Sequence, residues 1–74
     1  MSFIFNNNEQ IVIEIKKLII ENKVSQKYLA EKLGLTPQGF TKLINKKNFG
    51  FEDTKKILDA LNYSLIISFQ KKEE

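Results

Sequence analysis

Three polar residues near the middle of the chain have types and a spacing that suit hydrogen bonding to a patterned surface. Gln38, Thr41 and Lys42 stand at i, i+3 and i+4, so a helix through this stretch would present them on one face. An amide can pair with adenine through two bonds, an ammonium can reach guanine O6 and N7, and a threonine methyl can contact a thymine methyl. The same residues also suit an ordinary solvent-facing helix, so the elements around them decide their chemistry.

Positive charge is concentrated around these three residues. The chain carries a formal net charge of +3, whereas residues 24–50 hold five lysines and one glutamate, a balance of +4. The rest of the chain is therefore slightly acidic. A basic stretch of this kind favours a polyanion as partner, although a lysine-rich solvated surface has the same composition.

Composition argues against an enzyme or a metal protein. The chain has no cysteine and no histidine, which removes disulfides and nearly all zinc chemistry. Its candidate acids have helix-surface spacings and no nucleophile or glycine-rich phosphate loop beside them; they are Glu31, Glu52, Asp53 and Asp59. We therefore expect no catalytic residue, no metal and no cofactor.

Residues 25–47 predict two short helices joined by a tight turn, which would position the three polar residues. Ser25 and Thr36 suit N-caps, Pro37 suits a first helical position, and Gly34 suits a left-handed turn. Apolar residues follow each cap; they are Leu29, Ala30 and Leu33, then Phe40, Leu43 and Ile44. Helices this short are marginal alone, so they should pack together as a helix-turn-helix unit with the second helix facing outward.

Two further helices should flank this unit. The first, at about residues 9–22, follows an asparagine N-cap and has one apolar stripe: Ile11, Val12, Ile15, Leu18 and Ile19. Ile13 and Ile20 fall on its opposite face, by coincidence, as a dimer contact, or under a docked N-terminal arm. The other helix, at about residues 52–61, has an acidic first turn and precedes Asn62, which suits a left-handed C-terminal residue.

The last segment changes its period from helical to alternating. Its apolar positions are Tyr63, Leu65, Ile67 and Phe69. Period two over residues 63–70, with β-branched and aromatic types, predicts a strand. A strand needs a partner, which could be residues 2–5, the same strand of a second subunit, or both. The apolar triplet at residues 3–5 itself suits a hydrophobic staple, a short strand or a frayed end.

These elements predict a mainly α fold: a compact four-helix helix-turn-helix domain with one C-terminal β-strand, paired across a dimer or with the N-terminal arm. With 74 residues, the chain should form one domain. Within it, residues 1–8 are an arm, 9–62 the helical domain, 63–70 the strand and 71–74 a charged tail. No apolar run is long enough for a membrane span, and the N-terminus lacks the features of a secretory signal, so we expect a cytoplasmic protein.

Over residues 25–45 the sequence resembles the Cro-like (XRE-type) phage-repressor family of helix-turn-helix DNA-binding proteins. The matching positions are Ser25, Gln26, Leu29, Ala30, Leu33, Gly34, Thr36, Phe40, Leu43 and Ile44. The flanking helices extend the likeness to about residues 9–62. Pro37, Tyr28 and Lys46 depart from the family pattern, so base specificity does not carry over from it.

The resemblance implies roles for individual residues. Gln26 matches a position that bonds a DNA phosphate, and the exposed face of the second helix, residues 37–45, matches the part that enters the major groove. Asn45 and the Lys46–Lys47 pair match the loop that follows the DNA backbone. The expected DNA-binding residues are Gln26, Thr36, Gln38, Gly39, Thr41, Lys42, Asn45, Lys46 and Lys47. Gly39 would either let the helix sit deep in the groove or serve packing.

We therefore expect a sequence-specific, dimeric, DNA-binding transcriptional regulator, with double-stranded DNA and a second copy as partners. Its dimer contacts would come from Tyr63, Leu65, Ile67, Phe69, Ile13 and Ile20. Two recognition helices would then lie about 34 Å apart on one face of DNA. The alternative is a protein-interaction module, such as a toxin–antitoxin partner, that uses the C-terminal strand.

Overall fold

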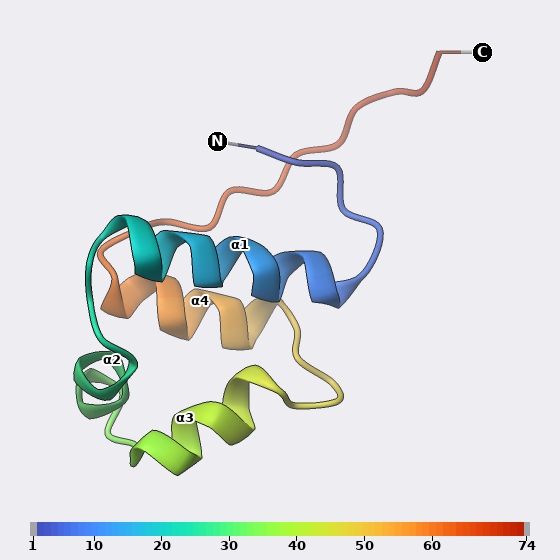
Figure 1. Cartoon of the computed structure of the whole chain (residues 1–74). Coiled ribbons are helices and arrows are strands. Elements are labelled where there is room, and N and C mark those ends of the chain that lie inside the picture. Colours follow the sequence, from blue (N-terminus) through green and yellow to red (C-terminus); the bar gives the residue numbers. More distant parts are fainter. Residues whose placement is uncertain (1, 74) are drawn as a thin grey trace.

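Four α-helices make up the folded body of the chain, in a computed structural model that describes residues 2–73. They are α1 (Asn8–Glu21), α2 (Gln26–Lys32), α3 (Pro37–Ile44) and α4 (Phe51–Ala60) (Figure 1). All four predicted helices are confirmed, and the first and last begin and end one residue earlier than expected. No helix within residues 2–73 has both the length and the apolar character needed to cross a membrane.

Capping residues of the predicted types account for where the helices begin, and the asparagine cap of α1 lies one residue earlier than expected. Asn7 caps α1 by accepting from the Gln10 N–H, and the Gln10 side chain accepts from the Asn7 N–H in return. Ser25 accepts from the Tyr28 N–H and caps α2. Thr36 caps α3, with Pro37 at its first position. Each cap satisfies backbone donors that have no partner inside the helix.

Two turns have the left-handed backbone that the sequence predicts. Gly34, in the turn between α2 and α3, has φ of +72°. Asn62, after α4, has φ of +64°. Glycine and asparagine adopt the left-handed region at little energetic cost, so each residue suits its turn.

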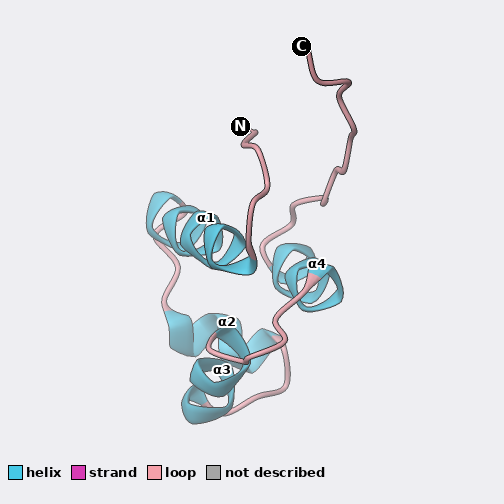
Figure 2. Ribbon diagram, turned by 90° about the vertical axis from the view of Figure 1, so that its right-hand side faces the viewer, coloured by secondary structure: helices cyan, strands magenta, loops and turns pink. Residues whose placement is uncertain are grey.

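The helices enclose one apolar core. α1 lies along α4, while α2 packs against both α3 and α4 (Figures 1 and 2). The buried apolar residues are Ile11, Ile15, Ile19, Leu29, Ala30, Phe40, Ile44, Phe49, Ile57 and Leu58. Phe49 belongs to the loop after α3, yet only 2% of it is exposed. Burial of Phe49 holds the basic loop between α3 and α4, residues 45–50, against the helices. The backbone of Lys46 and Lys47, in the same loop, is thereby positioned beside α3.

The predicted C-terminal strand is wrong for the chain by itself. Residues 2–73 contain no β-strand, and residues 63–73 run as an extended segment without regular structure (Figure 2). The last backbone hydrogen bond joins the Tyr63 N–H to the Leu58 carbonyl at 2.8 Å. A strand exists only where a neighbouring backbone supplies a ladder, and within this range no segment supplies one.

Within residues 2–73, the N-terminal arm makes no backbone hydrogen bond to the C-terminal segment. Its backbone is held at the start of α1, where the Asn6 and Asn7 N–H groups donate to Gln10 Oε1. Farther out, the Phe5 ring lies 5.6 Å from the Phe51 ring at the start of α4, measured between centroids. The expected arm begins at Met1 and the expected tail ends at Glu74, and these two residues lie outside the described range.

Candidate nucleic-acid interface

The outer face of α3 carries the three polar residues that the spacing places together. Gln38, Thr41 and Lys42 are all exposed. On the opposite side of the same helix, Phe40 is completely buried and Ile44 is 4% exposed. Packing of these two apolar residues against the core therefore fixes which side of α3 faces solvent.

Hydrogen bonds within α3 decide which groups of the helix can reach a ligand. The Thr41 hydroxyl donates to the Pro37 carbonyl at 3.1 Å, and Asn45 Nδ2 donates to the Thr41 carbonyl at 2.9 Å. The Thr41 methyl therefore remains the outward-facing part of that side chain. Gln38 and Lys42, by contrast, make no side-chain hydrogen bond or ion pair within residues 2–73, so both are available to a partner.

Gly39 lies in the first turn of α3, next to the cap. Its N–H donates to Thr36 Oγ1 at 3.0 Å. A Cβ on Gly39 would lie 3.3 Å from that same oxygen and 3.6 Å from the Leu35 Cβ. The absent side chain thus leaves room for the capping threonine, which is a packing reason for glycine here. Deep entry of this turn into a groove remains a prediction.

Lys46 is tied to α4 by an ion pair. Its Nζ lies 3.4 Å from both carboxylate oxygens of Asp53. Asp53 is buried, and its Oδ2 also accepts from the Gly50 N–H at 3.1 Å. The Gly50 hydrogen bond, supported by Lys46, holds the pKa of the Asp53 carboxyl below its ordinary value, although burial acts in the opposite direction. Lys47 makes no such contact within residues 2–73 and is exposed.

A shallow hollow beside α3 brings in a lysine that sequence reasoning missed. Its lining consists of Leu33, Leu35, Gly39, Lys42, Leu43, Lys46 and Lys56. Lys56 belongs to α4, so three lysines from two helices and a loop surround one apolar floor. Helical periodicity places Lys56 on the outer side of α4, but no signal in the sequence locates that side next to α3.

The remaining expected DNA-binding residue, Gln26, is the first residue of α2 and is exposed. Its side chain makes no hydrogen bond within the described residues. Nearby, the Lys32 ammonium lies 5.7 Å from the centre of the Tyr28 ring. Tyr28 therefore has a local partner at the position where the family pattern often has a capping glutamate.

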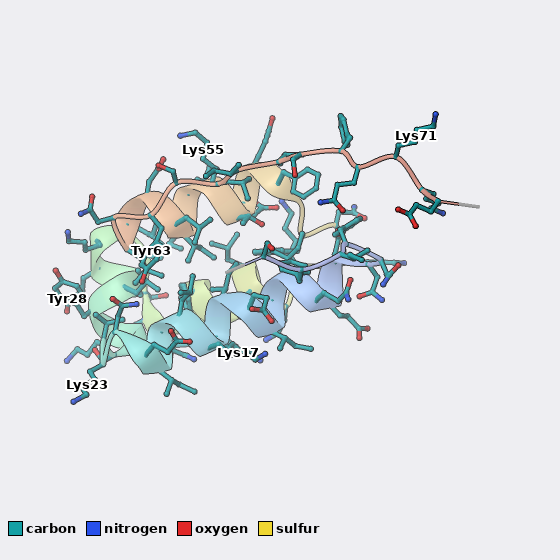
Figure 3. The ribbon with its side chains drawn as sticks, turned by 90° about the horizontal axis from the view of Figure 1, so that it is seen from above. Lys17, Lys23, Tyr28, Lys55, Tyr63 and Lys71 are labelled. Atoms are coloured by element: carbon teal, nitrogen blue, oxygen red, sulfur yellow. The ribbon has the colours of Figure 1, made fainter. Side chains whose placement is uncertain are left out.

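The residues expected to form a dimer contact lie away from this interface. Both ends of the chain leave the helices on the side opposite α3 (Figures 1 and 2). In Figure 3, Tyr63 lies between the ends of α1 and α4, and its hydroxyl accepts from Asn22 Nδ2 at 3.1 Å. Ile13, Ile20 and Ile67 are each more than half exposed. The structure therefore separates the two sets of expected contacts onto different sides.

Comparison with known proteins supports the interpretation of α2 and α3. A family model described as "Helix-turn-helix" matches residues 15–67, most of the chain. The match begins within α1, includes α2, α3 and α4, and ends in the C-terminal segment. Neither the curated proteins nor the solved structures contain a match to the chain.

Proposed function

Because the chain belongs to the Cro- and XRE-like helix-turn-helix family of DNA-binding regulators, we propose that it binds specific DNA sequences with α3 in the major groove. The observation that carries the proposal is the outward face of α3, where Gln38, Thr41 and Lys42 are exposed above a buried Phe40. Gln38 would bond adenine, Lys42 would bond guanine, and the Thr41 methyl would contact thymine. No enzymatic step is part of this function.

The surrounding residues would bind the phosphates. Lys47 and Lys56 would each neutralise one phosphate, while Lys46 would do so from its place beside Asp53. Gln26, Thr36 and Asn45 would add uncharged contacts at the ends of α2 and α3. Several neutralised phosphates per chain predict an affinity that falls steeply with rising salt.

We further propose that the functional unit is a homodimer on DNA. One α3 reaches only a few base pairs, and two copies about 34 Å apart would read two half-sites on one face of the duplex. The proposal is supported by the position of α3, which lies on the side opposite both chain ends (Figure 1). Pairing through the chain ends would leave both recognition helices accessible.

Binding to a random-sequence duplex library, followed by affinity measurements on the selected site, tests this function. Lys42→Ala should relax the base preference at one position, with a loss of about 1–3 kcal/mol on the best site. Lys47→Ala should weaken all sequences alike and reduce the slope of log K against log salt by about one.

Lys17→Ala is the matched control, since it removes an exposed lysine from α1 that pairs with Glu14. This variant should bind as the original chain does. If Lys42→Ala and Lys47→Ala affect binding no more than Lys17→Ala, the assigned interface is wrong.

A second candidate function is a protein-interaction module, such as the antitoxin partner of a toxin. The observation that favours it is the exposed C-terminal segment, where Ile66 is 86% and Phe69 is 96% exposed. Purification of the natural complex from cells, with and without residues 63–74, separates the two functions. A stoichiometric partner of different sequence that is retained only by the full chain would favour this candidate.

A further inference from the structure

The hollow beside α3 combines apolar and basic side chains in one small space. It lies where α3, the loop after α3 and α4 meet, and its volume is about 380 Å³. Its three leucines, here called the floor, are Leu33, Leu35 and Leu43, and its three lysines, here called the rim, are Lys42, Lys46 and Lys56. Gly39 completes the lining, which within residues 2–73 includes no acidic residue. All charge around the apolar floor is therefore positive.

The floor is only partly covered by the folded chain. Leu33 and Leu43 are half-buried and pack against the core, whereas Leu35, in the turn between α2 and α3, is 36% exposed. The Leu35 N–H donates to the Ala30 carbonyl at 2.8 Å, which holds the backbone of this turn in place. A single exposed leucine is ordinary on a protein surface. Here, however, it adjoins two further leucines inside a ring of lysines, so the apolar surface is continuous and preformed.

The rim carries positive charge that the described chain does not neutralise. Lys46 Nζ lies 3.4 Å from both carboxylate oxygens of Asp53. Lys42 and Lys56, by contrast, make no ion pair within residues 2–73, and both are exposed. The rim therefore offers two ammonium groups to a ligand, and a carboxylate is the side-chain group that pairs with them most strongly.

We propose that this hollow docks an acidic segment of a partner protein, with a large apolar side chain on the floor and neighbouring carboxylates on Lys42 and Lys56. Charge complementarity favours an acidic partner, because the lining holds charge of one sign only. A DNA backbone would neutralise the same lysines, but its phosphate and sugar oxygens would leave the floor without an apolar contact. A leucine or phenylalanine of the partner would remove the exposed part of Leu35 from water.

Docking in this hollow would exclude DNA, because one lysine serves both surfaces. Lys42 lines the hollow and also lies on the outer face of α3, beside Gln38 and Thr41. An ammonium that is paired with a partner's carboxylate cannot also bond guanine. An acidic protein bound here would therefore release the regulator from its site. This exclusion rests on the proposed function, whereas the docking site itself does not.

Selection from a random peptide library displayed on phage, against the full chain without DNA, tests the docking site. The enriched peptides should combine glutamate or aspartate with at least one large apolar residue. The affinity of a selected peptide should fall about tenfold in Leu35→Ala, which shortens the floor but keeps the backbone bond to Ala30. It should fall about threefold in Lys56→Ala, which removes one rim charge.

Lys55→Ala is the matched control for Lys56→Ala. Lys55 is the neighbouring exposed lysine of α4, it pairs with Asp59 at 2.8 Å, and it does not line the hollow. This control should bind the peptide as the original chain does. Circular dichroism checks that the helices remain in Leu35→Ala, and the change at the exposed Lys56 tests the site even if that variant unfolds.

Three outcomes of the selection would overturn the docking site. One is that no peptide is enriched, and another is that the enriched peptides are acidic without any apolar residue, since charge alone would then explain them. The third is a peptide affinity that Lys56→Ala changes no more than Lys55→Ala does.

The exclusion is measured separately, with the duplex selected from the DNA library. The peptide should displace this duplex from the original chain, and folded Leu35→Ala should bind the duplex normally, since Leu35 is not among the proposed DNA contacts. Simultaneous binding of peptide and duplex would overturn the exclusion. Loss of duplex binding in folded Leu35→Ala would assign the floor to DNA instead of a protein. Peptide binding by a chain that binds no duplex would refute the proposed function and support the docking site.

Discussion

The proposed recognition helix α3 and the C-terminal segment 63–70 are both eight residues long, yet only α3 is complete within a single chain. α3 satisfies its backbone groups internally and at its caps, and it buries one face against the core. The C-terminal segment has more apolar residues, five of eight against three of eight in α3, but no neighbour to pair with among residues 2–73. The difference shows that a helix needs only its own sequence and a surface to pack on, whereas a strand also needs a second backbone.

The largest expected effect contrasts two phenylalanines, one in each region. Phe40 is fully buried under α3, so Phe40→Ala should lower the free energy of unfolding by about 3–5 kcal/mol. That loss approaches the whole stability expected of so small a domain, and the helices should largely unfold. Phe69 is 96% exposed, so Phe69→Ala should change the stability of the monomer by less than about 0.5 kcal/mol.

Urea unfolding followed by circular dichroism, at concentrations too low for dimers, measures both phenylalanine variants. Equal urea midpoints for Phe40→Ala and Phe69→Ala would contradict the expected difference between α3 and the C-terminal segment. At higher concentration, Phe69→Ala should lower the dimer fraction if the proposed homodimer pairs through the chain ends.

A smaller effect compares two hydroxyl residues. Thr36 Oγ1 accepts the Gly39 N–H at 3.0 Å and caps α3, so Thr36→Ala should cost about 1 kcal/mol of stability. Ser64 makes no side-chain hydrogen bond within the described residues, so Ser64→Ala should leave monomer stability unchanged. Thr36→Ser keeps the capping oxygen and serves as the control in the same thermal or urea unfolding experiment. A cap effect would be refuted if the serine and alanine variants of Thr36 were equally unstable.

The smallest effect concerns the ion pair between Lys46 in the basic loop and Asp53 in α4. Residues 63–70 carry no charged side chain and so have no comparable ion pair. The pKa of Asp53 is lowered by the Gly50 hydrogen bond and by Lys46, so the folded state favours the ionised carboxylate. This contribution is present in full above the ordinary aspartate pKa, near 4, and is lost as the pH falls through the lowered pKa.

Asp53→Asn should therefore destabilise the chain at neutral pH and make its stability fall less steeply between about pH 5 and pH 2. Unfolding at a series of pH values measures this slope, and Asp59→Asn is the matched control because Asp59 is an exposed partner of Lys55. If stability changed with pH equally steeply in the Asp53→Asn variant and the original chain, the contacts of Asp53 with Lys46 and Gly50 would be excluded as a source of pH dependence.

Much of the helical body could be predicted from local chemistry. The caps at Ser25 and Thr36, the turn at Gly34 and the left-handed Asn62 each depend on interactions within a few residues, and the structure has each of them as expected. The outward face of α3 followed from the spacing of its polar residues. Hydrophobic periodicity also identified most of the core, since each helix buries its apolar stripe.

The features that sequence reasoning missed all involve residues distant in the chain. Phe49 belongs to a loop without periodicity, and only the arrangement of the helices shows that it is buried. Lys56 joins Lys42 and Lys46 around one hollow because α4 passes beside α3. The predicted strand at residues 63–70 was wrong for the single chain because alternation identifies a strand-forming sequence but not its partner.

The sequence by itself thus determined the four helices, their caps and the polar face of α3, because helical hydrogen bonds and caps join residues at most a few positions apart. Only the tertiary structure decided which lysines surround that face, that Lys46 pairs with Asp53, and that the chain ends project from the opposite side. These features depend on the angles at which the helices cross, and the packing of the whole core sets those angles. The tertiary structure of one chain does not complete the extended C-terminal segment, because strand hydrogen bonds require a second backbone and residues 2–73 provide none.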